Sequence, residues 1–100
     1  EDIHYYNRDR TEDYDYRLLS FVRWSENEKL VILANFDDSR TYNFSLKIPE
    51  NIINTWELKE GSYSLEEVLS SDTSYKLKIV DGEGFIDLKV APLESFIFKL

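Results

Sequence analysis

Two neighbouring stretches of the chain, residues 29–36 and 41–48, differ in how apolar and polar positions are arranged. Residues 30–34 carry no polar side chain, which indicates a strand covered on both faces. From Tyr42 to Ile48 apolar and polar side chains alternate, which indicates a strand with one face in water. Asp37-Asp38-Ser39 supplies turn residues between the two stretches. We therefore expect them to pair as a β-hairpin.

The rest of the chain shows further short runs rich in β-branched and aromatic residues. Predicted strands lie at residues 17–24, 29–36, 41–48, 55–58, 74–80, 85–90 and 95–100. The turn Asp81-Gly82-Glu83-Gly84 tolerates positive φ and predicts a second hairpin. Ala91-Pro92 separates the last two strands, because proline cannot donate to a ladder. This spacing predicts an all-β fold: an antiparallel β-sandwich of about seven or eight strands of the Greek-key type.

Two segments between the strands have a different pattern. Pro49 with an acidic residue behind it predicts one short helical turn. In residues 64–69, the spacing of Leu65, Val68 and Leu69 fits either a helical turn or a strand, and both interpretations stay open.

The first fifteen residues differ from the rest. Residues 1–15 are mostly polar or charged and show no period that would pack a face, so we interpret them as a linker or docking arm. Residues 16–100 hold the predicted sandwich, and 100 residues are enough for one domain. Because the chain begins with Glu1-Asp2, we expect a processed product or a fragment of a longer protein.

Composition removes several classes of partner and cofactor. A net charge of −8 opposes binding to nucleic acid and to anionic membrane surfaces, since such binding depends on Lys and Arg contacts. No apolar stretch approaches the roughly 20 residues that span a bilayer. The chain has no cysteine, which excludes disulfides, iron–sulfur clusters and thiolate zinc sites. Cytoplasmic and periplasmic or secreted locations both remain open.

Residues for catalysis are scarce. His4 is the single histidine, so neither a Ser/His/Asp triad nor a zinc site is expected. No glycine-rich loop precedes a helix with lysine, and acidic residues such as Asp37 and Glu83 fit turns better than a catalytic pair. We expect no catalytic residue, no metal and no cofactor.

Aromatic side chains near strand ends and in loops leave two interpretations open. Trp24, Trp56 and Tyr63 could stack on sugar rings, or the tryptophans could close the ends of the sandwich. The tyrosines of the N-terminal segment are expected to contact another domain; they are Tyr5, Tyr6, Tyr14 and Tyr16.

Two longer stretches carry a family resemblance. Residues 14–49 read YDYRLLSFVRWSENEKLVILANFDDSRTYNFSLKIP, and residues 81–100 read DGEGFIDLKVAPLESFIFKL. In their order they resemble the C-terminal β-sandwich domain of α-amylase-family enzymes, glycoside hydrolase family 13. The anchors are Asn35-Phe36, which end an apolar strand, and the closing strand after Pro92.

The resemblance implies a non-catalytic accessory domain of an enzyme that acts on α-glucans. The family's catalytic carboxylates sit on a preceding (β/α)8 barrel, and no position here corresponds to them. Residues 1–15 would link the two domains, and the sandwich would pack on the barrel and stabilise it. The alternatives are an autonomous carbohydrate-binding module for starch or maltooligosaccharide and a protein-interaction sandwich. If a barrel covers an apolar patch, the isolated fragment should self-associate weakly.

Overall fold

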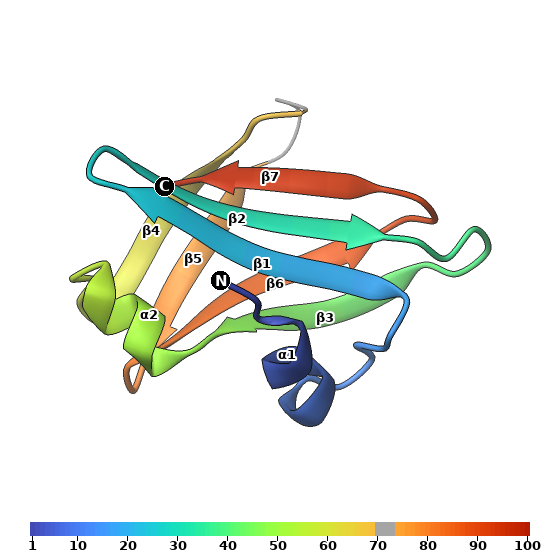
Figure 1. The fold of residues 1–100 in the computed structure, drawn as a ribbon, viewed down its shortest axis with the longest axis horizontal. Coiled ribbons are helices and arrows are strands. Elements are labelled where there is room, and N and C mark those ends of the chain that lie inside the picture. Colours follow the sequence, from blue (N-terminus) through green and yellow to red (C-terminus); the bar gives the residue numbers. More distant parts are fainter. Residues whose placement is uncertain (70–73) are drawn as a thin grey trace.

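The computed structural model describes residues 1–69 and 74–100, and in these the chain forms seven strands and two short helices (Figure 1). In chain order they are α1 His4–Arg10, β1 Leu18–Ser25, β2 Glu28–Asn35, β3 Tyr42–Ile48, α2 Glu50–Thr55, β4 Gly61–Glu67, β5 Tyr75–Val80, β6 Glu83–Val90 and β7 Ser95–Lys99.

The seven strands form one curled antiparallel sheet in the order β1-β2-β7-β4-β5-β6-β3. The strands β1, β2 and β7 lie side by side in one layer, and the other layer holds β3, β6, β5 and β4 (Figure 1). One end of β4 pairs with β5 and the other end pairs with β7, so β4 joins the layers. β6, the last strand of the β4–β5–β6 meander, lies beside β3, which precedes the meander in the chain; this is a Greek-key arrangement. The predicted all-β fold is confirmed.

The predicted hairpin across residues 29–48 is wrong. β2 pairs with β1 and β7, whereas β3 pairs with β6 in the other layer. The connection between them crosses from one layer to the other because β1 and β7 occupy both edges of β2; within it, buried Asp37 accepts hydrogen bonds from the Ser39 and Arg40 N–H groups. The turn residues Asp37-Asp38-Ser39 therefore lie in a connection between the two layers and not in a hairpin.

The second predicted hairpin is confirmed. Val80 pairs with Glu83, and the two residues between them, Asp81 and Gly82, both have positive φ (52° and 83°). This is the backbone that two-residue hairpins require.

The chain between β3 and β5 corrects one prediction and resolves another. The helical turn expected after Pro49 is α2, but residues 55–58 are no strand: α2 ends at Thr55, where buried Ile52 and Ile53 hold it against the core. The open segment at residues 64–69 belongs to β4 up to Glu67, because Leu65 and Glu67 are buried in alternation.

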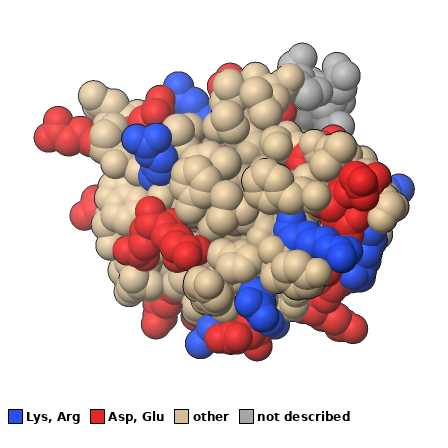
Figure 2. All heavy atoms as spheres, turned by 45° about the vertical axis from the view of Figure 1, so that its right-hand side comes forward, with Lys and Arg blue, Asp and Glu red and all other residues tan. Residues whose placement is uncertain are grey.

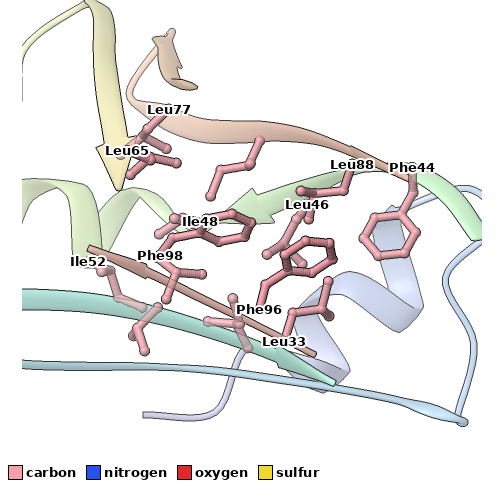
Figure 3. Close-up of a cluster of buried hydrophobic side chains, with 14 of the residues drawn as sticks. Leu33, Phe44, Leu46, Ile48, Ile52, Leu65, Leu77, Leu88, Phe96 and Phe98 are labelled. Carbon is pink, nitrogen blue, oxygen red and sulfur yellow. The ribbon is translucent and has the colours of Figure 1, made fainter. Parts of the chain in front are cut away.

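The core fills the space between the two layers (Figure 3). Leu33, Phe96 and Phe98 come from one layer and Leu46 and Leu88 from the other, and all are buried. The rings of Phe96 and Phe98 stack with their centroids 5.2 Å apart. The layers are therefore held together by close apolar packing.

Residues 1–15 contain α1 and lie against β1 and β3 (Figure 1). Their buried side chains are Ile3, Asn7, Thr11 and Tyr14, which recur at helical spacing. The sequence pattern gave no apolar period here because two of these four residues are polar.

Candidate functional site

The outer surface of the β1-β2-β7 layer is apolar. Its polar outward side chains lie at or near strand ends and are Arg23, Ser25, Glu28, Ser95 and Lys99. Its apolar outward side chains are Leu19, Phe21, Leu30, Ile32, Ala34 and Ile97, and all are exposed or half-buried. We call these six residues the apolar face. The strand register makes them neighbours: Phe21 lies opposite Ile32, and Ile32 lies opposite Ile97.

The outer surface of the other layer is polar. Its outward side chains are Asn43, Ser45, Lys47, Ser62, Ser64, Lys76, Lys78, Asp87 and Lys89, with Val80 and Phe85 as apolar exceptions. This contrast follows directly from the sequence, because β3 alternates strictly whereas β2 carries apolar residues at both parities. The two surfaces of the sandwich therefore suit different surroundings.

A space-filling view shows one side of the molecule, turned by 45° from the view of Figure 1. Figure 2 shows a broad area of uncharged side chains near the centre of the face, with Lys, Arg, Asp and Glu mostly toward its margins. Depletion of charged side chains at the centre of a surface is typical of an interaction surface.

Three large apolar side chains lie near the ends of β1 and β2, beyond the apolar face. Tyr16, Phe36 and Leu93 are 66%, 65% and 63% exposed. The Phe36 N–H donates to the carbonyl of Arg17 (2.8 Å), and the Leu93 N–H donates to the carbonyl of Asp37 (3.1 Å). These main-chain contacts fix the loops that present the three side chains.

Asp37 stabilises these loops through the hydrogen bonds that its buried carboxylate accepts. Hydrogen bonds from the Ser39 N–H, the Tyr42 hydroxyl and the Arg17 guanidinium hold the pKa of the Asp37 carboxyl well below its usual range. Arg17 Nη1 lies 3.1 Å from Asp37 Oδ2. The Asp37 carboxylate therefore has a structural role, because its oxygens accept hydrogen bonds from neighbouring groups of the same loops.

The predicted sugar-contact residues are brought together only in part. Trp24 is 41% exposed and packs edge-on against Trp56, with ring centroids 6.1 Å apart and planes at 79°. Trp56 is buried, and its Nε1 has no hydrogen-bond partner among the described residues. Tyr63 is half-buried, and its hydroxyl donates to the carbonyl of Lys59 (2.8 Å). The tryptophans thus form a perpendicular pair with one ring at the surface.

The tyrosines of the N-terminal segment divide into exposed and enclosed ones. Tyr5 and Tyr16 are well exposed. Tyr6 donates a hydrogen bond to Glu83, and partial burial together with this carboxylate raises the pKa of Tyr6 to about 12. Tyr14 is buried beside Ser20 (2.7 Å between oxygens), and burial raises the pKa of Tyr14 to about 12. Only the first two offer much surface to a partner.

The six residues of the apolar face are not among the site residues predicted from the sequence. A signal was present, because a strand with no polar residue on either face needs cover on both sides. The structure covers Val31 and Leu33 with the core and leaves Leu30 and Ile32 half-buried.

Comparison with known families identifies the family of this domain. A model described as the alpha amylase C-terminal all-beta domain matches residues 9–100. The chain belongs to this family. Neither a curated protein nor a solved structure matches it. The resemblance seen in the sequence is confirmed, and domains of this family normally accompany a catalytic domain in the same chain.

The described residues of this α-amylase C-terminal domain contain no cluster of three or more His, Asp or Glu side chains that could hold a metal ion. Neither helix in the described ranges has the length and hydrophobicity to cross a membrane.

Proposed function

We propose that this domain is a non-catalytic accessory domain of an α-amylase-family glycoside hydrolase acting on α-glucans. In this proposal it packs on and stabilises a (β/α)8 catalytic barrel that precedes it in the same chain. The observation that carries the proposal is the apolar face, in a family that accompanies a catalytic domain.

The physical argument concerns the free energy of exposed apolar surface. Each Å² of apolar area removed from water contributes about 25 cal/mol. Covering neighbouring side chains such as Phe21, Ile32 and Ile97 therefore stabilises whatever packs on them and the domain itself. The polar outer surface of the other layer gains nothing comparable and is expected to stay in water.

The residues 1–15 belong to the same proposal as the link to the barrel. Tyr5 and Tyr16 are the exposed tyrosines of this stretch and of its junction with β1, and they are our candidates for contacts between the domains. Tyr6 and Tyr14 would hold this segment in place on the domain, since their hydroxyls form hydrogen bonds with Glu83 and Ser20.

The test uses the full-length protein from which this chain comes. Reading its gene should show a barrel with catalytic carboxylates upstream of residue 1. In that enzyme, Ile32→Glu should lower the thermal midpoint at which activity is lost, because it places a charge in the interface. Ser64→Glu, on the polar outer surface of β4, is the matched control and should leave the midpoint unchanged. A gene without a barrel, or equal effects of the two variants, would reject the proposal.

A second function, sugar binding, rests on the exposure of Trp24. Its ring is flanked by two surface hollows of about 270 and 210 Å³, whose polar lining includes Arg23, Ser25 and Glu28. Binding by one ring should be weak, because Trp56 stands perpendicular and gives no flat platform. We expect maltoheptaose to shift the Trp24 indole signal in an NMR titration and to leave it unmoved in Arg23→Ala. Absence of any shift at millimolar sugar would end this idea.

A further inference from the structure

The curled sheet has two free edges, at β1 and at β3, because these strands stand at the ends of the ladder. A free edge presents unpaired N–H and C=O groups and is a ready site for pairing with another chain. Both edges in this domain are covered by the same short segment.

At β1 the cover is main chain. The Val22 N–H donates to the carbonyl of Glu1 (2.8 Å), the Ile3 N–H donates to the carbonyl of Ser20 (3.2 Å), and Asp2 lies opposite Phe21 in an antiparallel bridge. Residues 1–3 thus act as a short added strand.

At β3 the cover is a side-chain amide. The Lys47 N–H donates to Asn7 Oδ1 (2.8 Å), and Asn7 Nδ2 donates to the carbonyl of Lys47 (2.9 Å). The amide thereby reproduces the paired bonds of a neighbouring strand. Further along the edge, the Asn43 N–H donates to Asp13 Oδ2 (2.9 Å).

The amide of Asn7 is held firmly in this position. Asn7 is fully buried, its Nδ2 also donates to the carbonyl of Ile3 (2.9 Å), and its Oδ1 also accepts from the Thr11 hydroxyl (2.6 Å). The side chain of Ile3 is itself buried in the core. The contacts at β1 and at β3 are therefore parts of one connected unit.

We propose that residues 1–14 form a strap that closes the open side of the sheet and keeps β3 from pairing with β3 of a second copy of this chain. The strap begins before the region that matches the family, and this inference does not depend on the proposed function.

A second copy suits the uncovered edge because β3 is complementary to itself. In an antiparallel pair centred on Ser45, Asn43 would lie opposite Lys47, and Phe44 would lie opposite Leu46. No like charges would meet. Polar side chains would point to water and apolar ones would continue the core.

The test is Asn7→Ala in the 100-residue chain that also carries Ile32→Glu, so that association through the apolar face is suppressed. Asn54→Ala in the same background is the matched control, because Asn54 is an exposed asparagine of α2, away from β3 and the strap, whose side chain makes no hydrogen bond within the described part of the chain. We expect Asn7→Ala to lower the hydrogen-exchange protection of the Lys47 N–H at least tenfold and to produce a concentration-dependent dimer by sedimentation. The control should do neither.

Unchanged protection of Lys47 in a variant that stays monomeric would overturn the proposal, and so would an equal dimer in the control. If Asn7→Ala does not fold, the unmodified chain provides a second test. Its N–H groups at Ile3, Val22, Asn43 and Lys47 should exchange through one shared opening at urea concentrations below the unfolding midpoint. Separate openings, or exchange only on global unfolding, would equally refute the strap.

Discussion

At the scale of single residues, Asn35 and Asp37 explain why the chain can cross between layers at this point. Asn35 Nδ2 donates to the carbonyls of Arg40 (3.1 Å) and Ala91 (3.0 Å), and Asn35 Oδ1 accepts from the Asp37 N–H (2.8 Å). Asp37 then binds the next turn. Asn35, one of the two residues that anchored the family resemblance, thus ties the β2–β3 connection to the β6–β7 connection.

The charge of Asp37 makes the stability of the domain depend on pH. Because the folded state lowers its pKa, Asp37 contributes its full stabilisation above the unfolded carboxyl pKa of about 3.9 and loses it as pH falls toward the folded value. Asp37→Asn should therefore lower the urea midpoint at pH 7, and the gap from the unmodified chain should be smaller at pH 3.

Asp38→Asn is the matched control for this prediction, since Asp38 is the exposed neighbour. It should change the midpoint little at either pH. A gap for Asp37→Asn that is equally wide at pH 3 and pH 7 would contradict the assigned role of the charge. Urea unfolding followed by tryptophan fluorescence measures all three proteins.

At the scale of elements, the contact between α2 and β6 depends on a glycine. A Cβ on Gly84 would lie 3.0 Å from Ile53 Cδ1, 3.1 Å from Leu77 Cδ1 and 3.2 Å from Ile48 Cβ. The helix can approach the sheet this closely only because position 84 has no side chain.

Gly84→Ala should therefore destabilise the domain by about 1–3 kcal/mol through overpacking. Ile53→Val removes the atom nearest to the added methyl group. The double variant should be less destabilised than the sum of the two single variants, as measured by a double-mutant cycle in chemical denaturation. Strict additivity would show that the helix is not the element that the new methyl group displaces.

Sequence patterns predicted strands where side chains alternate beside a glycine turn, as at β5 and β6, but they left part of β4 open between a strand and a helical turn. These patterns led to wrong predictions where contacts between residues far apart in the sequence determine the local structure. The link after β2 has hairpin chemistry, but both edges of β2 are paired with β1 and β7. Residues 55–58 have strand composition, but they close α2 in a turn where Glu57 has positive φ (57°). The apolar face was predictable in principle, since residues 30–34 alone demand cover on both sides.

At the scale of the whole molecule, the apolar face and the net charge of −8 act against each other. Apolar contact favours association of two isolated domains, whereas like charge opposes it and is screened by salt. The isolated chain should therefore associate weakly, and more strongly at higher ionic strength.

Sedimentation equilibrium at low and high salt measures this association. Ile32→Glu should abolish it, and Ser64→Glu on the polar surface should preserve it apart from the added charge. An unmodified chain that stays monomeric at millimolar concentration in high salt would contradict the prediction.

β4 belongs to both layers, and this has a consequence for how the domain responds to load. Among the described residues it pairs with β7 through Glu66 with Lys99 and Glu67 with Phe98, and the Val68 N–H donates to the carbonyl of Ile97 (2.8 Å). A force that separates the layers would act on this short pairing and on the apolar core, whereas a force along β1 or β2 would be shared by long ladders of hydrogen bonds. The domain should therefore resist a force along β1 and β2 better than a force that separates the two layers, and under the second force the layers should part with β4 as the hinge.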